Sequence, residues 1–217
     1  MFWLWSGRRS RRICKGDPSH LVQRQTNKKS GCYYTMKVKN WQLALALGIG
    51  ATTVALALNS CASIPKGAVA VKPFDREKYL GKWYEIARLD FRFEKNLSNV
   101  TATYSLRDDG LIKVDNKGYD DNKGIWKQSI GKAKFVGPTD EAQLKVSFFG
   151  PFYAPYNVIA IDENYQCALV AGKNLSYLWI LSRTPSIPAA IRANYLKQAQ
   201  SLGYDVRSLV WTKHDKQ

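Results

Sequence analysis

Cysteine is scarce in this chain of 217 residues, which contains four. Cys14 and Cys32 precede a long uncharged segment, Cys61 stands at the end of that segment, and Cys167 alone remains in the rest of the chain. A lone thiol has no partner for an internal disulfide. The folded part must therefore be stabilised by a hydrophobic core, and a composition of 45% hydrophobic and 12% aromatic residues is sufficient to form one.

Histidine is rarer still, and the short motifs of common enzyme classes are absent. The two histidines, His20 and His214, lie near opposite ends of the sequence. No Gly-x-Ser-x-Gly, His-Glu-x-x-His or Cys-x-x-Cys motif occurs. We therefore expect no catalytic residue, no metal site and no cofactor.

Acidic residues are too few to balance the basic ones, and the net charge is +16. Residues 1–60 hold ten Lys or Arg and one acidic residue, Asp17, which leaves a net charge of +7 from Cys61 onward. The densest basic cluster, residues 8–12, lies in this N-terminal part, and no basic run interleaved with aromatic residues follows it. We therefore expect no nucleic-acid partner. The remaining positive charge favours either solubility or attraction to anionic lipid head groups.

Residues 36–60 have the parts of a bacterial signal peptide. Lys37 and Lys39 form the positive end, and residues 41–58 carry no charge. A permanent transmembrane helix is the alternative, since about 18 uncharged residues can span a bilayer. Residues 1–35 have no helical or strand periodicity, and we interpret them as an extension upstream of the true start, with a functional tail as the alternative.

Residues 58–61, at the end of the uncharged run, resemble the lipobox of bacterial lipoproteins. Leu58, Ser60 and Cys61 match the motif, whereas Asn59 is less usual at its position. The resemblance implies that Cys61 is the lipid attachment site, with everything before it removed, and several acyl chains anchor a protein stably to a membrane. Ala62 in place of aspartate implies the outer membrane, with the protein facing the periplasm.

The remainder of the chain has the pattern of an all-β domain over residues 74–217, preceded by a linker at residues 61–73. Short alternating segments are separated by turn residues about every ten positions. Such turns favour sequential antiparallel hairpins, which close most simply into an up-and-down barrel. Residues 186–203 have apolar side chains at helical spacing and end in glycine, which predicts one amphipathic helix outside the barrel. The eight expected strands are 82–90, 99–106, 111–118, 125–136, 142–149, 156–162, 165–171 and 177–182, and a short segment at 208–212 follows the helix.

Three blocks of this domain resemble the signatures of the lipocalin family. Residues 79–88 contain Gly-x-Trp at the start of the first strand, residues 157–162 resemble the second block, and residues 178–183 resemble the third, which ends in arginine. Residues 146–153 are similar to bacterial outer-membrane and apolipoprotein D-like lipocalins. The resemblance implies an eight-stranded antiparallel β-barrel with one C-terminal α-helix packed outside, and an interior just large enough for side chains or one small ligand.

The positions of the blocks assign roles to individual residues. The resemblance gives Trp83 and Arg183 a structural role, in which the indole plugs the narrow end of the barrel and the guanidinium lies across it. Residues that share the inward parity of these two should line the ligand cavity. For each of them plain core packing is the alternative, above all near Trp83. The expected cavity residues are Ala87, Ala102, Tyr104, Val114, Phe135, Val146, Phe148 and Trp179.

The resemblance also implies a function, which is binding of fatty acids or lysophospholipids. With the membrane anchor, it predicts a protein that stores or transports membrane lipids for envelope maintenance, including under stress. Three alternatives stay open. The ligand could be haem or another pigment, with Tyr104 or Cys167 as the axial ligand; the protein could be an isomerase of the lipocalin type with Cys167 as nucleophile; or the barrel could be filled and purely structural. The oligomeric state is left open.

Overall fold

The computed structural model describes residues 63–91 and 94–216. The expected extension, the signal peptide and Cys61 lie outside these ranges. Within them, no helix has the length and apolar character needed to cross a membrane.

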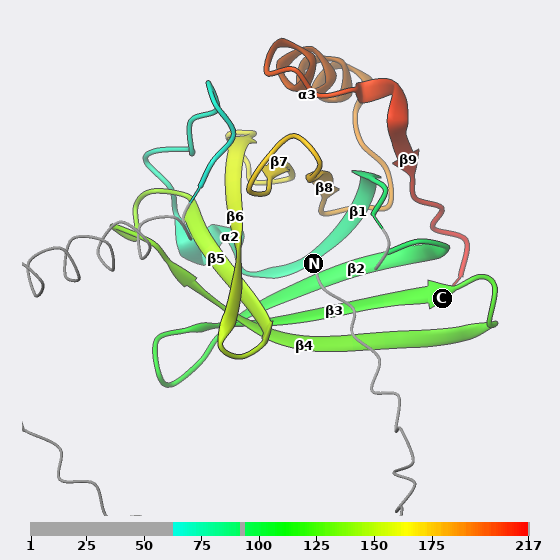
Figure 1. Cartoon of the computed structure of the whole chain (residues 1–217), viewed down its shortest axis with the longest axis horizontal. Coiled ribbons are helices and arrows are strands. Elements are labelled where there is room, and N and C mark those ends of the chain that lie inside the picture. The colour runs from blue at the N-terminus through cyan, green and yellow to red at the C-terminus, as the bar shows by residue number, and fades with distance from the viewer. Residues whose placement is uncertain (1–62, 92–93, 217) are drawn as a thin grey trace, which may run out of the picture. The chain divides into compact units, whose positions relative to one another are not determined.

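Eight strands form a closed antiparallel barrel (Figure 1), which confirms the fold expected from the sequence. Each strand pairs with the next along the chain from β2 to β8, and β1 pairs with both β8 and β2, which closes the sheet. A ninth strand, β9 (Leu209–Trp211), pairs with the end of β1. The barrel strands are β1 (Gly81–Leu89), β2 (Leu97–Leu106), β3 (Ile112–Asp120), β4 (Ile125–Phe135), β5 (Gln143–Phe149), β6 (Phe152–Ile161), β7 (Cys167–Ala171) and β8 (Leu178–Ser182).

Most strand boundaries lie within two residues of the sequence prediction, and the starts of β6 and β7 differ for identifiable local reasons. Strand β6 begins four residues earlier than expected, at Phe152, because Pro155 is accommodated within the ladder opposite Lys145. Strand β7 begins two residues later, at Cys167, because the Asp162 carboxylate accepts backbone N–H groups of the turn that precedes it. An Asp side chain that caps a turn in this way competes with the strand ladder.

The predicted helix is present and covers the outside of the barrel. α3 (Ala189–Ser201) buries Tyr195 and Ala199. The Tyr195 hydroxyl donates to the carbonyl of Cys167 at 2.9 Å, which fastens the helix to β7. Gly203, with φ of 93°, follows the helix end, where a left-handed residue without a side chain is favoured. Two short elements complete the chain, the single turn α2 (Arg76–Tyr79) and the 3₁₀ helix η1 (Val206–Ser208).

A bulge in β1 changes which of its side chains enter the barrel. The register with β8 shifts between Glu85 and Ala87, so that Ala87 lies opposite Ile180 and Arg88 lies opposite Trp179. Directly opposed residues of an antiparallel pair point to the same face. Ala87 and Ile180 are buried together in the cluster between barrel and helix. Ala87 was expected in the cavity but faces outward, because the extra residue of the bulge gives the inward position to Arg88.

Residues 63–73, expected to be a linker, lie against the barrel. The backbone N–H of Val71 donates to the carbonyl of Val158, and the N–H of Ala142 donates to the carbonyl of Val71, each at 2.9 Å. Ala70 is buried, and Ile64 packs on the same outer cluster as α3. This segment therefore packs on the outer cluster through Ile64 and on the interior cluster through Val71, and it extends the folded domain in the N-terminal direction.

One end of the barrel is closed by Trp83 and Arg183. The Arg183 guanidinium carbon lies 3.8 Å from the centroid of the Trp83 indole. The same guanidinium donates to the carbonyls of Lys78, Leu80 and Lys82 at 2.6, 2.8 and 2.8 Å. Arg183 therefore joins the last barrel strand to the segment that enters the first, and the opposite end, where β1 finishes, is called the mouth below.

We predict that Arg183→Lys lowers the free energy of unfolding by about 2–3 kcal/mol, because an ammonium cannot make the forked set of carbonyl contacts or stack as a planar group. Urea unfolding followed by circular dichroism measures this value. Arg192→Lys is the matched control, since Arg192 also lies 3.8 Å over an indole, that of Trp211, on the exposed face of α3. The Arg192→Lys substitution should lower the free energy of unfolding by less than about 1 kcal/mol. Equal losses in the two variants would show that the carbonyl contacts of Arg183 contribute nothing.

Candidate ligand cavity

Most of the expected cavity residues come together inside the barrel. Five of them are buried in one interior cluster, and two others pack against it while remaining partly exposed, whereas Ala87 lies in the outer cluster. The buried five are Ala102, Tyr104, Val114, Val146 and Trp179, and the partly exposed two are Phe135 and Phe148.

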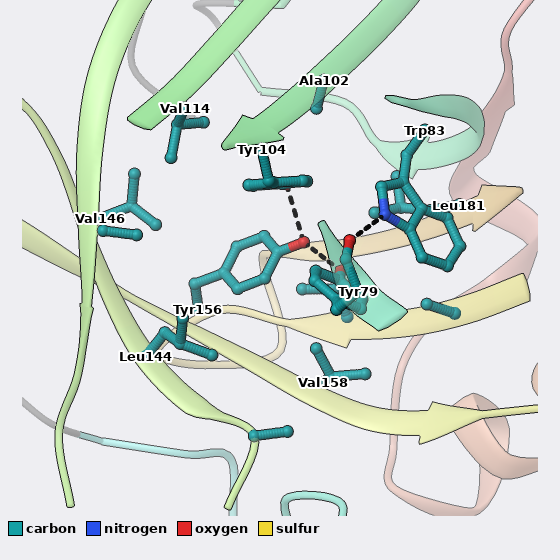
Figure 2. Packing of buried hydrophobic residues seen from close by; sticks show 14 of the residues in the cluster. Tyr79, Trp83, Ala102, Tyr104, Val114, Leu144, Val146, Tyr156, Val158 and Leu181 are labelled. Carbon is teal, nitrogen blue, oxygen red and sulfur yellow. Dashed lines mark hydrogen bonds between the residues drawn. The ribbon is translucent and has the colours of Figure 1, made fainter. Parts of the chain in front are cut away.

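A chain of three tyrosine hydroxyl groups crosses the interior above Trp83 (Figure 2). The hydroxyl of Tyr156 lies 2.6 Å from that of Tyr79 and 2.9 Å from that of Tyr104. Burial raises the pKa of all three above the ordinary value of tyrosine, so the three phenols are neutral. Three O–H hydrogens serve two hydrogen bonds, which leaves one hydrogen able to reach a bound polar group or water.

Sequence alternation identified Tyr104 but missed Tyr79 and Tyr156. Tyr79 belongs to α2, outside any strand, at the closed end of the barrel. The Trp83 indole N–H donates to the Tyr79 carbonyl at 2.8 Å, which holds this residue beside the barrel interior. Tyr156 is the first residue of the strand predicted at 156–162, where parity is hard to assign. Since Val158 is buried in the same cluster, alternation back from Val158 would have found it.

A cluster of charged side chains lies nearer the mouth, made of Glu85, Arg88 and Glu94, which we call the mouth cluster. Arg88 donates to the Glu85 carboxylate and to the backbone carbonyl of Glu94, each at 2.6 Å. The Trp179 indole N–H donates to the Glu94 carboxylate at 3.2 Å. All three charged side chains are 2% exposed or less. The mouth cluster thus joins β1 and the β1–β2 loop to the cavity wall at Trp179.

Two neighbouring cavities lie along this interior. The inner one, of about 20 Å³, includes Tyr104, Val114, Val146 and Tyr156 in its lining. The outer one, of about 110 Å³, lies at the mouth between the β5–β6 and β7–β8 hairpins and includes Lys173 and Tyr177. Both are lined by Ala154, Pro155 and Trp179. Neither of them, nor the two together, reaches the roughly 300 Å³ of a typical small-molecule site, so an elongated ligand that occupies both must displace side chains between and around them.

Comparison with known proteins agrees with this architecture. The family model described as a lipocalin-like domain matches residues 74–214. This chain belongs to the lipocalin family. The outer membrane lipoprotein Blc of Escherichia coli K12 is 52% identical over 167 residues, which cover 76% of this chain and 94% of that protein. Apolipoprotein D of Mus musculus is 35% identical over 164 residues, covering 71% of this chain and 82% of that protein.

Solved structures share the lipocalin fold at low sequence identity. Insecticyanin from the tobacco hornworm Manduca sexta superposes with a TM-score of 0.56 at 20% identity, covering 70% of this chain and 86% of that one. The cockroach allergen Per a 4 gives the same TM-score and identity, with 70% and 95% coverage. At this identity the likeness establishes the fold alone.

The electrostatics of this lipocalin's interior centre on Glu94. Burial, with a smaller contribution from the nearby Glu85 carboxylate, raises the pKa of Glu94 from an ordinary value of 4.5 to about 8. Arg88 keeps its charge, because its carboxylate neighbours more than offset the burial that alone would lower its pKa. With Glu94 protonated, the charges of Glu85 and Arg88 cancel within the mouth cluster. Glu94 Oε1, Glu85 Oε2 and Arg88 Nε have no hydrogen-bond partner among the described residues.

Cys167 lies on the other side of the barrel wall from the cavity. It is 1% exposed in the cluster between the wall and α3, and its thiol makes a weak hydrogen bond to the Ser182 hydroxyl at 3.9 Å. Burial raises the pKa of the thiol, which opposes thiolate formation. The geometry therefore gives no support to Cys167 as a cavity nucleophile or as a haem ligand. Among the described residues, no three His, Cys, Asp or Glu side chains are grouped to hold a metal ion.

We predict that the free energy of unfolding of the wild type, compared at each pH with that of the Glu94→Gln variant, falls as the pH rises from about 5 to 8. The native state keeps the Glu94 proton up to about pH 8, whereas the unfolded chain releases it above its ordinary pKa. In this window the native state therefore binds one more proton, and stability falls by up to about 1.4 kcal/mol per pH unit. The glutamine variant lacks this dependence but keeps an acceptor for Trp179.

The measurement is the free energy of unfolding in urea at pH 5, 6, 7 and 8 for both proteins. Other titrating groups are common to the two, so their difference isolates Glu94. Parallel pH profiles would mean that Glu94 is ionised in the folded protein.

Proposed function

We propose that this lipocalin binds a lipid with a single acyl chain, either a fatty acid or a lysophospholipid, and stores or transports it at the bacterial outer membrane. The observation that carries the proposal is the pair of neighbouring cavities that share Trp179 in their linings. The inner cavity combines apolar walls with the neutral hydroxyl groups of Tyr104 and Tyr156, and the outer one opens at the mouth beside Lys173. An elongated apolar molecule with one polar end fits that sequence of surroundings.

The energetics favour an acyl chain as the apolar part. If the interior widens around the ligand, burying about 12 methylene groups at roughly 0.8 kcal/mol each releases on the order of 10 kcal/mol before association costs. Micromolar binding requires about 8 kcal/mol net. Hydrogen bonds to the polar end of the ligand must therefore offset part of the association cost. The spare hydrogen of the tyrosine chain is a group available for this purpose, because Tyr104 and Tyr156 line the inner cavity.

A lipid anchor at Cys61 is part of the proposal. The lipobox-like residues that end at Cys61 support it, as does the similarity to Blc, which is described as an outer membrane lipoprotein. We propose the periplasmic face of the outer membrane as the location. Cys61→Ser should abolish incorporation of labelled palmitate, whereas Cys167→Ser should leave it unchanged. Labelling that persists in the Cys61 variant would refute the anchor.

Val114→Trp tests the ligand site, because Val114 is 1% exposed and lines the inner cavity. We predict that it weakens binding of a fluorescent lysophospholipid to the delipidated protein at least ten-fold, since an indole would occupy the cavity. Lys113→Trp is the matched control, because the neighbouring side chain on β3 points away from the interior, and its affinity should match that of the wild type. Circular dichroism checks the fold of each variant.

Val146→Phe, a smaller insertion at a second cavity residue, keeps the test decisive if Val114→Trp does not fold. Wild-type affinity in a folded cavity variant would place the ligand elsewhere.

A further inference from the structure

The N-terminal segment is fastened to the barrel at the mouth. The Ser63 hydroxyl donates to the carbonyl of Lys173 at 3.4 Å, and the Asn157 side-chain amide donates to the carbonyl of Ser63, also at 3.4 Å. Lys173 belongs to the β7–β8 loop. That loop lies at the mouth, because β8 runs antiparallel to β1 and its Trp179 is opposite Arg88, near the end of β1. The first described residue of the chain thus lies at the rim.

Covalent geometry limits how far the lipid attachment site can be from this rim. Cys61 precedes Ser63 by two residues, and two residues span at most about 7 Å when fully extended. A lipid on Cys61 would therefore begin beside the β7–β8 loop. Since residues 63–73 are held on the wall, they do not act as a free tether that lets the barrel turn away.

The same part of the rim contains the opening of the outer cavity. Lys173, which accepts the Ser63 hydrogen bond through its carbonyl, lines that cavity together with Tyr153 and Tyr177. The wall opposite Lys173 is the start of β6, which follows the β5–β6 turn. An anchor at Cys61 would thus emerge on the same part of the rim as the opening of the outer cavity.

The tip of the β5–β6 hairpin presents apolar side chains to solvent at this end. Phe149 and Phe152 are opposed across the hairpin and are 43% and 78% exposed. Leu175 on the neighbouring β7–β8 loop is 42% exposed, and Lys173 beside it is also exposed. Exposed phenylalanine and leucine side chains with a lysine on the same rim suit the interface between bilayer and water, where the apolar groups enter the head-group region and the ammonium meets anionic lipid.

We propose that the lipid anchor and the β5–β6 hairpin together hold the mouth of the barrel against the bilayer, so that lipid passes directly between the leaflet and the outer cavity. The partner of this surface is the lipid bilayer itself. The proposal rests on the acyl-lipid binding and on the Cys61 anchor proposed above. It adds an orientation, with the mouth toward the membrane and the Trp83–Arg183 end away from it.

The orientation is tested on the lipidated protein purified from membranes and reconstituted into vesicles of phosphatidylethanolamine and phosphatidylglycerol. Phe152→Cys is labelled with an environment-sensitive fluorophore, and nitroxide-bearing lipids are added as quenchers. We expect strong quenching and a blue-shifted emission at position 152. Leu106→Cys is the matched control, because Leu106 is 45% exposed and ends β2 at the closed end. Its label should stay unquenched.

Equal quenching at positions 152 and 106, or none at 152, would overturn the proposal. Mass spectrometry of the purified protein first verifies the lipid on Cys61, and lysophospholipid affinity is measured on the same variants in detergent. A failure of orientation is therefore distinguishable from a failure of lipid binding. Cys167 is 1% exposed and is not expected to take the label.

A spacer provides a second, functional test. Twelve Gly and Ser residues inserted between Ala62 and Ser63 would let the barrel move about 20 Å from its anchor. We expect transfer of a fluorescent lysophospholipid from vesicles into the barrel to slow several-fold, while the affinity measured in detergent stays the same. The same spacer placed after Asp109, in the β2–β3 turn at the closed end, should leave the transfer rate unchanged. An unchanged rate with the Ala62 spacer would overturn the proposal.

Discussion

The contact between the Arg183 guanidinium and the Trp83 indole is the interaction on which the barrel depends. A sheet becomes a barrel only if its first and last strands meet, and Arg183 follows the last barrel strand while Trp83 belongs to the first. The guanidinium also donates to three carbonyls, those of Lys78 and Leu80 before β1 and that of Lys82 near its start. The two cavities described above lie on the mouth side of this closure, so the chemistry of the mouth bears directly on what can enter them.

The interior above this closure is not uniformly apolar. Three phenols lie over Trp83, an apolar zone follows, and the mouth cluster of Glu85, Arg88 and Glu94 lies nearest the mouth. Burying ions costs free energy unless they are paired, and partners here are incomplete, which is why Glu94 keeps its proton. Neutral but hydrogen-bonding surroundings suit a ligand that is apolar along its length and polar at one end. They also make the interior of this lipocalin sensitive to alkaline pH.

Alternation along strands predicted much of this interior and failed at particular places. It placed Ala102, Tyr104 and Val114 correctly because β2 and β3 keep a regular register over these residues. It failed at Ala87, because a bulge in β1 reverses the parity after Glu85. It also missed Glu94, which lies in the loop between β1 and β2 and belongs to no periodic pattern. A bulge and a loop conformation are each decided by contacts with residues distant in the sequence.

The sequence by itself determined the family, the eight strands and the outer helix, because hairpin turns, alternating polarity and the three signature blocks are local features that survive in any context. It also supplied Trp83 and Arg183 as a pair. The tertiary structure alone decided that Arg88 faces inward, that three tyrosines share hydrogen bonds and that Cys167 lies behind the wall. It likewise placed residues 63–73 on the barrel, with Ser63 at the rim. These features depend on register, packing and hydrogen bonds between segments up to 110 residues apart, which no local pattern encodes.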